Sequence, residues 1–202
     1  MSRGRIGVLG GSFDPPHLAH LALARLALQA LQLDELRWLP ARAPWQKSER
    51  VMASGKHRAA MVRGMIGGEP RFVLDGRELR RHGPTYTIDT VRELCAEAPA
   101  VQWILVIGQD QYARFDSWRD WPELLARCTL AVAARAGQAP LAAPAVAAVP
   151  HKLIVLDLPR QDISASEIRA RCAAGDDIAL LVGAAVARYI DQHALYTGRP
   201  RS

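Results

Sequence analysis

The sequence predicts an α/β fold, a doubly wound, Rossmann-like parallel sheet with helices on both faces and a small C-terminal helical part. Short apolar runs alternate along the chain with amphipathic helical patterns, which is typical of βαβ units. Residues 103–107 are apolar at every position, as a central strand of a parallel sheet requires. In such a sheet, ligands bind at the carboxyl ends of the strands.

The first elements follow directly from residue type. Ile6–Leu9 is a short apolar run and is expected to be a strand. Leu18–Gln32 is rich in leucine and alanine, which favour a helix. Leu36–Leu39 is expected to be the second strand because Pro40 ends the run. Ala41–Gly55 is polar and irregular, and it is expected to be a loop.

The middle of the chain repeats this alternation. Lys56–Met65 has a helical pattern, and Phe72–Leu74 follows it as a short strand. Thr85–Ala98 is expected to be a helix that ends before Pro99.

The last third supplies two more strands, Leu130–Ala133 and Leu153–Leu156. Between them, Gly137–Pro150 is rich in alanine and proline and is expected to be a surface excursion. Two helices, Ala165–Ala174 and Val182–His193, are expected to close the chain.

Length and composition indicate one globular domain, residues 1–202, with its C-terminal helical portion at about 164–196. The chain has 202 residues, half of them hydrophobic, which is enough to bury a core. We find no signal peptide and no apolar run near the ~20 residues of a membrane span. The three cysteines form no CxxC pair, which is typical of thiols in a reducing cytoplasm.

The net charge of +6 permits a nucleic-acid partner, but its distribution argues against one. The arginines are scattered, and the densest group is Arg77, Arg80 and Arg81. A dispersed basic surface that attracts small phosphorylated anions is the favoured interpretation.

The segment Gly10–His20, directly after the first strand, is the strongest functional signal. Backbone amides in a glycine turn before a helix N-terminus form a phosphate pocket. His17 and His20 are one helical turn apart, so both side chains are expected to face that pocket. Asp14 is expected to accept hydrogen bonds from the first amides of the helix. Two alternatives are ordinary surface histidines and a metal site, but a third ligand for a metal is not apparent.

A second signal is the segment Ile163–Arg169 near the other end of the chain. Ser164 and Glu167 have the spacing of a capping box, which is its structural explanation. The same helix start also offers hydroxyls, free amides and Arg169, all donors for phosphate oxygens. We therefore expect the two distant segments to meet around one triphosphate.

The two motifs, GGSFDPPHxxH and ISxSxIR, resemble those of the nucleotidyltransferase superfamily with the (H/T)xGH motif. Three further segments are similar to those of the bacterial nicotinate-nucleotide adenylyltransferases: PTYTIDT at 84–90, IGQD at 107–110 and FDSW at 115–118. The ending at 187–196 resembles theirs too, so the match runs from 6 to 196. The chain departs from the pattern at Ala19, where glycine is usual, at Ser166, where threonine is common, and at Arg119, where some relatives have tyrosine or histidine.

The resemblance implies that ATP and nicotinate mononucleotide give nicotinate adenine dinucleotide and pyrophosphate. The attack on the α-phosphorus is in line and needs no covalent intermediate, and Mg²⁺ enters bound through the ATP phosphates. Alternatives are an adenylyltransferase of the same fold for nicotinamide mononucleotide or phosphopantetheine, a basic nucleic-acid-binding protein, or a metal-dependent hydrolase. The sequence leaves the oligomeric state open.

The resemblance also implies roles for particular residues, and no residue is assigned to a metal. Those expected to be catalytic are His17, His20, Lys47 and Arg169. Those expected to bind ATP and its phosphates are Gly10, Gly11, Ser12, Phe13, His17, His20, Gly108, Asp110, Ile163, Ser164, Ser166 and Arg169. Those expected to bind the nicotinate nucleotide are Lys47, Thr85, Tyr86, Thr87 and Trp118. Each of three has a plain structural alternative: a solvated loop lysine for Lys47, a helix cap for Asp110 and core packing for Trp118.

Overall fold

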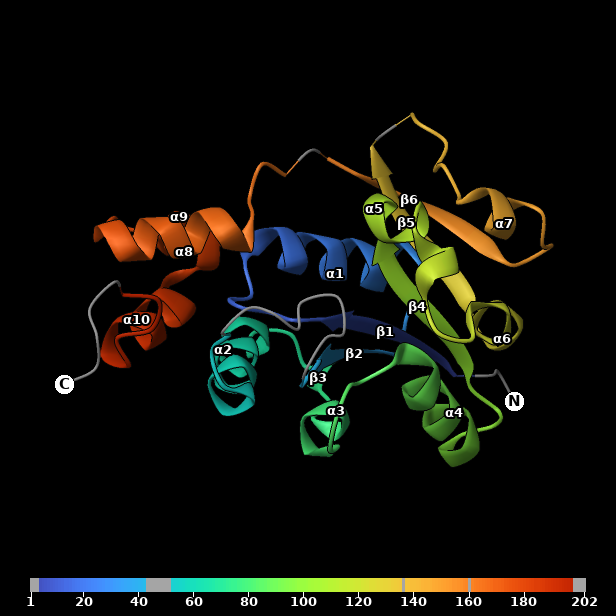
Figure 1. Ribbon diagram of the computed structural model, residues 1–202, viewed down its shortest axis with the longest axis horizontal. Coiled ribbons are helices and arrows are strands. Elements are labelled where there is room, and N and C mark those ends of the chain that lie inside the picture. The colour runs from blue at the N-terminus through green and yellow to red at the C-terminus, as the bar shows by residue number, and fades with distance from the viewer. Residues whose placement is uncertain (1–3, 43–51, 136, 160, 198–202) are drawn as a thin grey trace.

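The computed structural model describes residues 4–42, 52–135, 137–159 and 161–197. Six parallel strands form one sheet in the order β3-β2-β1-β4-β5-β6 (Figure 1). The strands are β1 Arg5–Gly11, β2 Glu35–Pro40, β3 Phe72–Leu74, β4 Gln102–Gly108, β5 Thr129–Arg135 and β6 Leu153–Leu158. All six predicted strands are present, so the α/β fold with a parallel sheet is confirmed.

The helices cover both faces of the sheet, as predicted. Helices α1 (Leu18–Ala30) and α2 (Gly55–Ile66) pack on one face, and α4 (Thr87–Glu97) and α6 (Trp121–Arg127) pack on the other. The strand order reverses between β1 and β4. Such a switch point leaves a crevice at the carboxyl ends of the strands.

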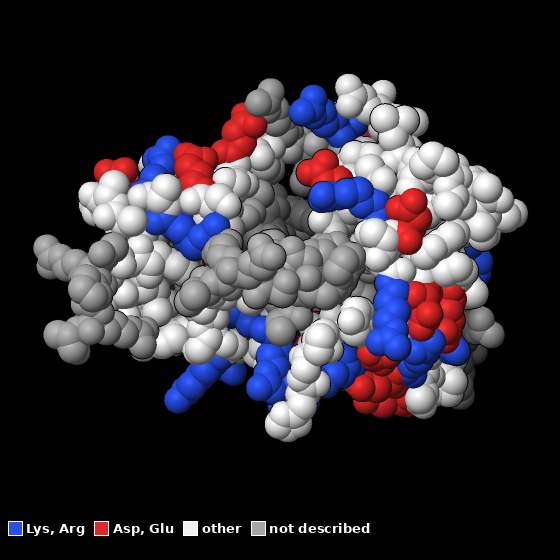
Figure 2. All heavy atoms as spheres, in the orientation of Figure 1, with Lys and Arg blue, Asp and Glu red and all other residues white. Residues whose placement is uncertain are grey.

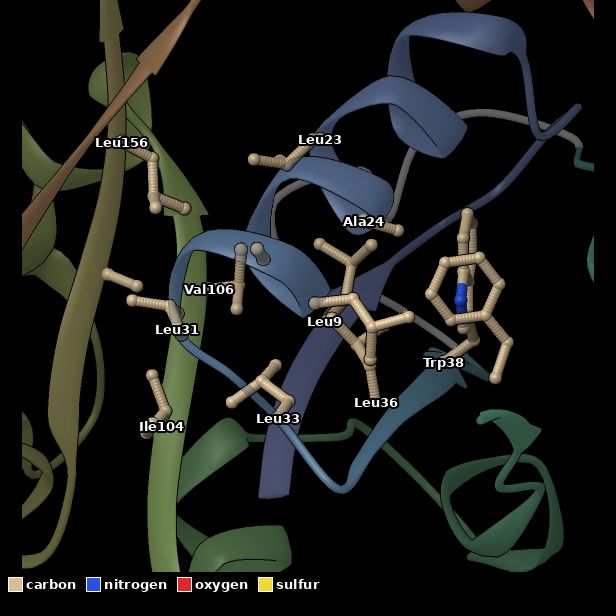
Figure 3. Packing of buried hydrophobic residues seen from close by; sticks show 14 of the residues in the cluster. Leu9, Leu23, Ala24, Leu31, Leu33, Leu36, Trp38, Ile104, Val106 and Leu156 are labelled. Atoms are coloured by element: carbon tan, nitrogen blue, oxygen red, sulfur yellow. The ribbon is translucent and has the colours of Figure 1, made fainter. Parts of the chain in front are cut away.

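Strand β4 contributes side chains to the apolar clusters on both faces of the sheet. Ile104 and Val106 belong to the cluster under α1, together with Leu23 and Leu156, as Figure 3 shows. Their neighbours in the strand, such as Leu105, belong to the cluster under α4 and α6. Because successive side chains of a strand point to opposite faces, a strand that is buried on both faces must be apolar throughout.

The C-terminal helices α8 (Ala165–Ala174), α9 (Ala179–Val182) and α10 (Ala184–Gln192) lie beside α2 at one end of the sheet (Figure 1). They form a third apolar cluster, to which α2 contributes Met61. The helix predicted over 182–193 is present as α10, but it begins at Ala184 instead of Val182. Gly183 has a φ of 79°, a left-handed backbone that ends α9 before α10 begins.

Other differences are local. The helix predicted over 85–98 begins at Thr87, because Tyr86 is extended, with φ −118° and ψ 137°. The excursion at 137–150 contains the short helix α7 (Pro144–Ala147), and its Val146 is fully buried. Other short helices that the sequence pattern missed include α3 Arg77–Arg80, α5 Gln109–Tyr112, the 3₁₀ turn η2 Phe115–Ser117, and α6 and α9. In the described part of the chain, no helix combines the length and apolar character needed to span a bilayer.

Gly7 of β1 tests the packing of the core under α1. A Cβ at this position would lie 2.6 Å from Leu33 Cδ1 and 3.2 Å from Leu36 Cδ1, both in buried side chains. We expect Gly7→Ala to lower the free energy of unfolding by about 1–3 kcal/mol through overpacking, measured by urea denaturation. Gly10→Ala is the matched control, because apart from its two chain neighbours no described residue comes within 4 Å of its Cβ position. Equal stability of the two variants would contradict this account.

Candidate functional site

A cavity of about 850 Å³ lies at the carboxyl ends of β1, β4 and β5, at the switch point of the sheet. Its walls include the last residues of these strands and the first turns of α1, α4 and α5. The parallel strands therefore bring residues from distant parts of the sequence to one site.

Residues Gly10–Pro15, named the phosphate turn from now on, connect β1 to α1. Gly10, Gly11 and Ser12 line the cavity. Phe13 does not line it: its ring is buried, and it contacts the His20 ring edge-on at a centroid distance of 5.1 Å. Phe13 has a φ of 47°, a left-handed backbone that is unfavourable for a bulky residue. A turn of this shape persists only where surrounding contacts hold it.

The two histidines stand together at the start of α1 and line the cavity. Their ring centroids are 3.7 Å apart. The backbone N–H of His17 donates to Nδ1 of His20 at 3.2 Å, so the neutral His20 ring carries its proton on Nε2. The His17 side chain is buried, and burial lowers its pKa to about 4. Nδ1 of His17 has no hydrogen-bond partner among the described atoms. His17 is therefore neutral at pH 7.

The second motif meets the first, as expected. Arg169 donates from Nη1 to the backbone carbonyl of Asp14 at 2.8 Å and from Nη2 to Ser166 Oγ at 2.9 Å. The cavity wall does not include the expected residues of this second motif: Ile163, Ser164, Ser166 and Arg169. The last residue of the chain that lines the cavity is Asp162.

Two expectations about helix caps need correction. The carboxylate of Asp14 does not cap α1, because His17 is the N-cap, and Asp14 Oδ1 accepts from Ala53 N–H and the Tyr196 hydroxyl. Ser164 caps α8 by accepting from the N–H of Glu167 at 3.1 Å. The other half of the capping box is absent, because the Glu167 side chain pairs with Arg171 at 2.7 Å.

One end of the cavity is formed by Thr85, Thr87 and Trp118. The hydroxyl of Thr85 and the indole Nε1 of Trp118 are buried and have no partner among the described atoms. The Trp118 ring stacks on Phe115 at a centroid distance of 5.0 Å. Tyr86 is not part of the cavity wall, and its ring packs under the Arg119 guanidinium at 4.8 Å.

Of the remaining expected site residues, two line the cavity and one lies outside the described part of the chain. Gly108 and Asp110 line the cavity at the junction of β4 and α5. Ala19, which stands where the resemblance has glycine, also lines it. Lys47 lies outside the described residues, and its role stays a prediction.

The cavity also contains residues that the sequence pattern missed, including Glu78, Thr90 and Arg135. Glu78 Oε1 accepts a hydrogen bond from Thr90 Oγ1 at 2.7 Å, and burial raises the pKa of its carboxyl group. Thr90 belongs to the PTYTIDT segment and could have been included from it. Glu78 stands in a charged run, Arg77–Arg81, where nothing distinguishes it from a solvated side chain.

The donors around the cavity indicate an anion site. Within 4–42, 52–135, 137–159 and 161–197, no group of three or more His, Cys, Asp or Glu residues could hold a metal ion. Beside the phosphate turn, the start of α1 presents two histidines, which suit phosphate oxygens.

Comparisons with known proteins agree with this geometry. A cytidylyltransferase-like family model matches residues 8–171. A Methylibium petroleiphilum protein named probable nicotinate-nucleotide adenylyltransferase is 52% identical over 196 residues, which cover 95% of this chain and 92% of that protein. A Bordetella petrii protein of the same name is 52% identical over 197 residues, covering 95% and 98%.

One solved structure shares the fold across nearly the whole chain. It is titled Plasmodium falciparum nicotinic acid mononucleotide adenylyltransferase complexed with NaAD, and it superposes with a TM-score of 0.79. The alignment is 20% identical and covers 96% of this chain and 97% of that one.

The lowered pKa of His17 predicts a pH dependence of stability. The pKa is about 4 in the folded chain and 6.5 ordinarily, so the unfolded chain binds more protons between these values. The stabilisation of the folded chain that comes from keeping His17 neutral is fully present above pH 6.5 and is lost as the pH falls toward 4. Between pH 6.5 and 4.5 we expect wild type to lose roughly 2–3 kcal/mol more than His17→Gln, measured by urea denaturation. Parallel pH curves for the two proteins would contradict the assignment.

Proposed function

The chain belongs to the cytidylyltransferase-like family and, within it, to the nicotinate-nucleotide adenylyltransferases, and we propose that it joins ATP and nicotinate mononucleotide. The products are nicotinate adenine dinucleotide and pyrophosphate. The observation that carries this proposal is the Arg169–Asp14 hydrogen bond, which unites the two phosphate motifs beside a cavity of about 850 Å³.

In the proposed reaction, a phosphate oxygen of nicotinate mononucleotide attacks the α-phosphorus of ATP. A new P–O bond forms, the bond to the β-phosphate breaks, and pyrophosphate carries away the electron pair. The phosphate nucleophile is already anionic, so the reaction requires no general base. The chain's contribution is positioning and charge stabilisation.

The proposed donors to the phosphates are His20 through Nε2–H, the amides of Gly11 and Ser12, and Lys47 from outside the described residues. The hydrogen bond to Nδ1 fixes the His20 tautomer, so its donor is set before the substrate arrives. We propose that Ser166 and Arg169 act with them from the second motif, where Arg169 also holds the phosphate turn.

We propose that Mg²⁺ enters with ATP and is held by the phosphate oxygens, a common coordination for this ion. When bound, it neutralises charge that develops on the phosphates. Because the described residues contain no three-ligand group, no side chain is assigned to it.

Thr85, Thr87 and Trp118 are proposed to bind the pyridine ring and its carboxylate. Trp118 offers a stacking face, and the N-terminus of α4 favours a negative charge. Tyr86 is proposed to act only indirectly, since it is absent from the cavity wall.

Charge pairing argues against the nucleic-acid alternative. Arg77 forms ion pairs with Asp75 and Glu97, and Arg81 pairs with Glu93. Figure 2 shows basic and acidic side chains interspersed on this face rather than a basic stripe.

We further propose that residues 1–202 act as one domain, which the apolar cluster shared between α2 and α8–α10 supports. We also propose that the protein is cytoplasmic.

The decisive assay is pyrophosphate release from ATP with three acceptors: nicotinate mononucleotide, nicotinamide mononucleotide and phosphopantetheine. A charge-assisted hydrogen bond contributes about 1.5–3 kcal/mol, so we expect kcat/KM to favour the acid over the amide by about 10- to 100-fold. Phosphopantetheine is expected to be inert. Equal rates for acid and amide would refute the assigned pyridine subsite, and no release with any acceptor would refute the function.

His20→Ala tests the phosphate end. Loss of one preorganised donor typically costs a hundredfold or more in rate, so we expect kcat to fall by about 100-fold with an unchanged melting temperature. His193→Ala is the matched control, because His193 stacks on Tyr189 and is not part of the cavity wall. A His20→Ala enzyme with the wild-type kcat would remove this residue from the mechanism.

A further inference from the structure

Asp14 of the phosphate turn is fixed from outside the cavity by the end of the chain. Its side chain is buried, with 1% of its surface exposed. Oδ1 accepts from the Tyr196 hydroxyl at 2.7 Å and from the N–H of Ala53 at 3.1 Å. Tyr196 itself has a φ of 62°, so its backbone stands in the left-handed region. A non-glycine residue stays there only where its surroundings hold it.

A second buried side chain holds the turn from α2. Arg58 is 1% exposed, and its guanidinium donates to three backbone carbonyls: Ser12 at 2.6 Å, Ala53 at 3.0 Å and Arg42 at 3.1 Å. Burial lowers the pKa of Arg58, and the Asp14 carboxylate counteracts part of that shift. The rigid fork of a guanidinium fixes several acceptors at once, which a lysine cannot do.

Neither Arg58 nor Tyr196 lines the cavity, so any effect on the reaction must pass through the turn. The turn needs such support, because Phe13 between Ser12 and Asp14 has an unfavourable backbone. Burying a cation and a carboxylate is costly, and apolar residues could have filled the same volume more favourably. Arg58 donates a hydrogen bond to Ser12, and Tyr196 donates one to Asp14, so the two contacts hold the residues on either side of Phe13.

We propose that Arg58 and Tyr196 are positioning residues for the phosphate turn. Acting on Ser12 and Asp14, they hold the backbone amides and the start of α1 where the ATP phosphates bind. This inference rests on the proposed function. It predicts that loss of either contact weakens the use of ATP while the pyridine subsite, built from other elements, is unaffected.

The test compares two Tyr→Phe variants that each remove one oxygen atom from the C-terminal part. Tyr196→Phe deletes the hydrogen bond to Asp14, and Tyr189→Phe deletes a contact at 3.1 Å to Nδ1 of His57 on α2. A hydrogen bond to a charged group typically changes an equilibrium by about tenfold or more, so we expect kcat/KM for ATP to fall about tenfold in Tyr196→Phe. KM for nicotinate mononucleotide is expected to stay near the wild-type value. Tyr189→Phe is expected to match wild type in both constants.

Arg58→Lys and Arg58→Met form a second arm, with Met61→Ala as a buried control on the same helix that lies in the third apolar cluster. We expect kcat/KM for ATP to decrease in the order wild type, Arg58→Lys, Arg58→Met, with Met61→Ala near wild type when assayed well below its melting temperature. If Arg58→Met does not fold, the tyrosine pair decides alone.

The values of kcat/KM for ATP distinguish a positioning role of Tyr196 from a role in stability alone. If Tyr196→Phe lowers the melting temperature but keeps the kcat/KM for ATP of Tyr189→Phe, the proposal is overturned. Wild type is assayed first, and absence of pyrophosphate release refutes the proposed function itself. The inference is then decided by calorimetric binding of ATP, for which Tyr196→Phe alone is expected to show a weaker Kd.

Discussion

The backbone carbonyl of Asp14 accepts a hydrogen bond from the guanidinium of Arg169, a residue 155 positions further along the chain. Through this contact the second motif reaches the first without entering the cavity wall. The contact depends on the sheet, which brings the end of β1 and the chain after β6 to the same edge. Because both strands are parallel, their following segments emerge on one side, where the start of α1 and the start of α8 can meet.

The histidines show how burial prepares a site for anions. His17 is kept neutral by burial, which lowers its pKa to about 4, and its backbone N–H fixes the tautomer of His20. Phe13 packs against the His20 ring and limits its rotation. His17 therefore adds no positive charge to the site, whose wall also includes Arg135. Preorganised dipoles stabilise developing charge without having to reorient during the reaction.

The sequence predicted the six strands because buried parallel strands leave unmistakable apolar runs, such as 103–107. It also predicted that the segments after β1 and β4 and the segment 84–90 would border one site, but the second motif lies outside the cavity wall. The sequence failed where tertiary contacts determine the role of a residue. Asp14 had the position of a helix cap, but its carboxylate accepts a hydrogen bond from the hydroxyl of Tyr196. Arg58 resembles any helix-surface arginine in sequence, and nothing local reveals its three backbone acceptors. The last helix was predicted to begin at Val182, whereas Gly183 leaves Val182 in α9 and α10 begins at Ala184.

The two ends of the cavity are built from different parts of the fold. The proposed phosphate residues lie on β1, at the start of α1 and in the second motif, whereas Thr85 and Thr87 lie before and at the start of α4 and Trp118 follows η2. Substitutions there can change which acceptor is used while the phosphate end stays intact. Under the proposed function, specificity and transfer chemistry are therefore separable, because sites on a shared scaffold vary independently of it.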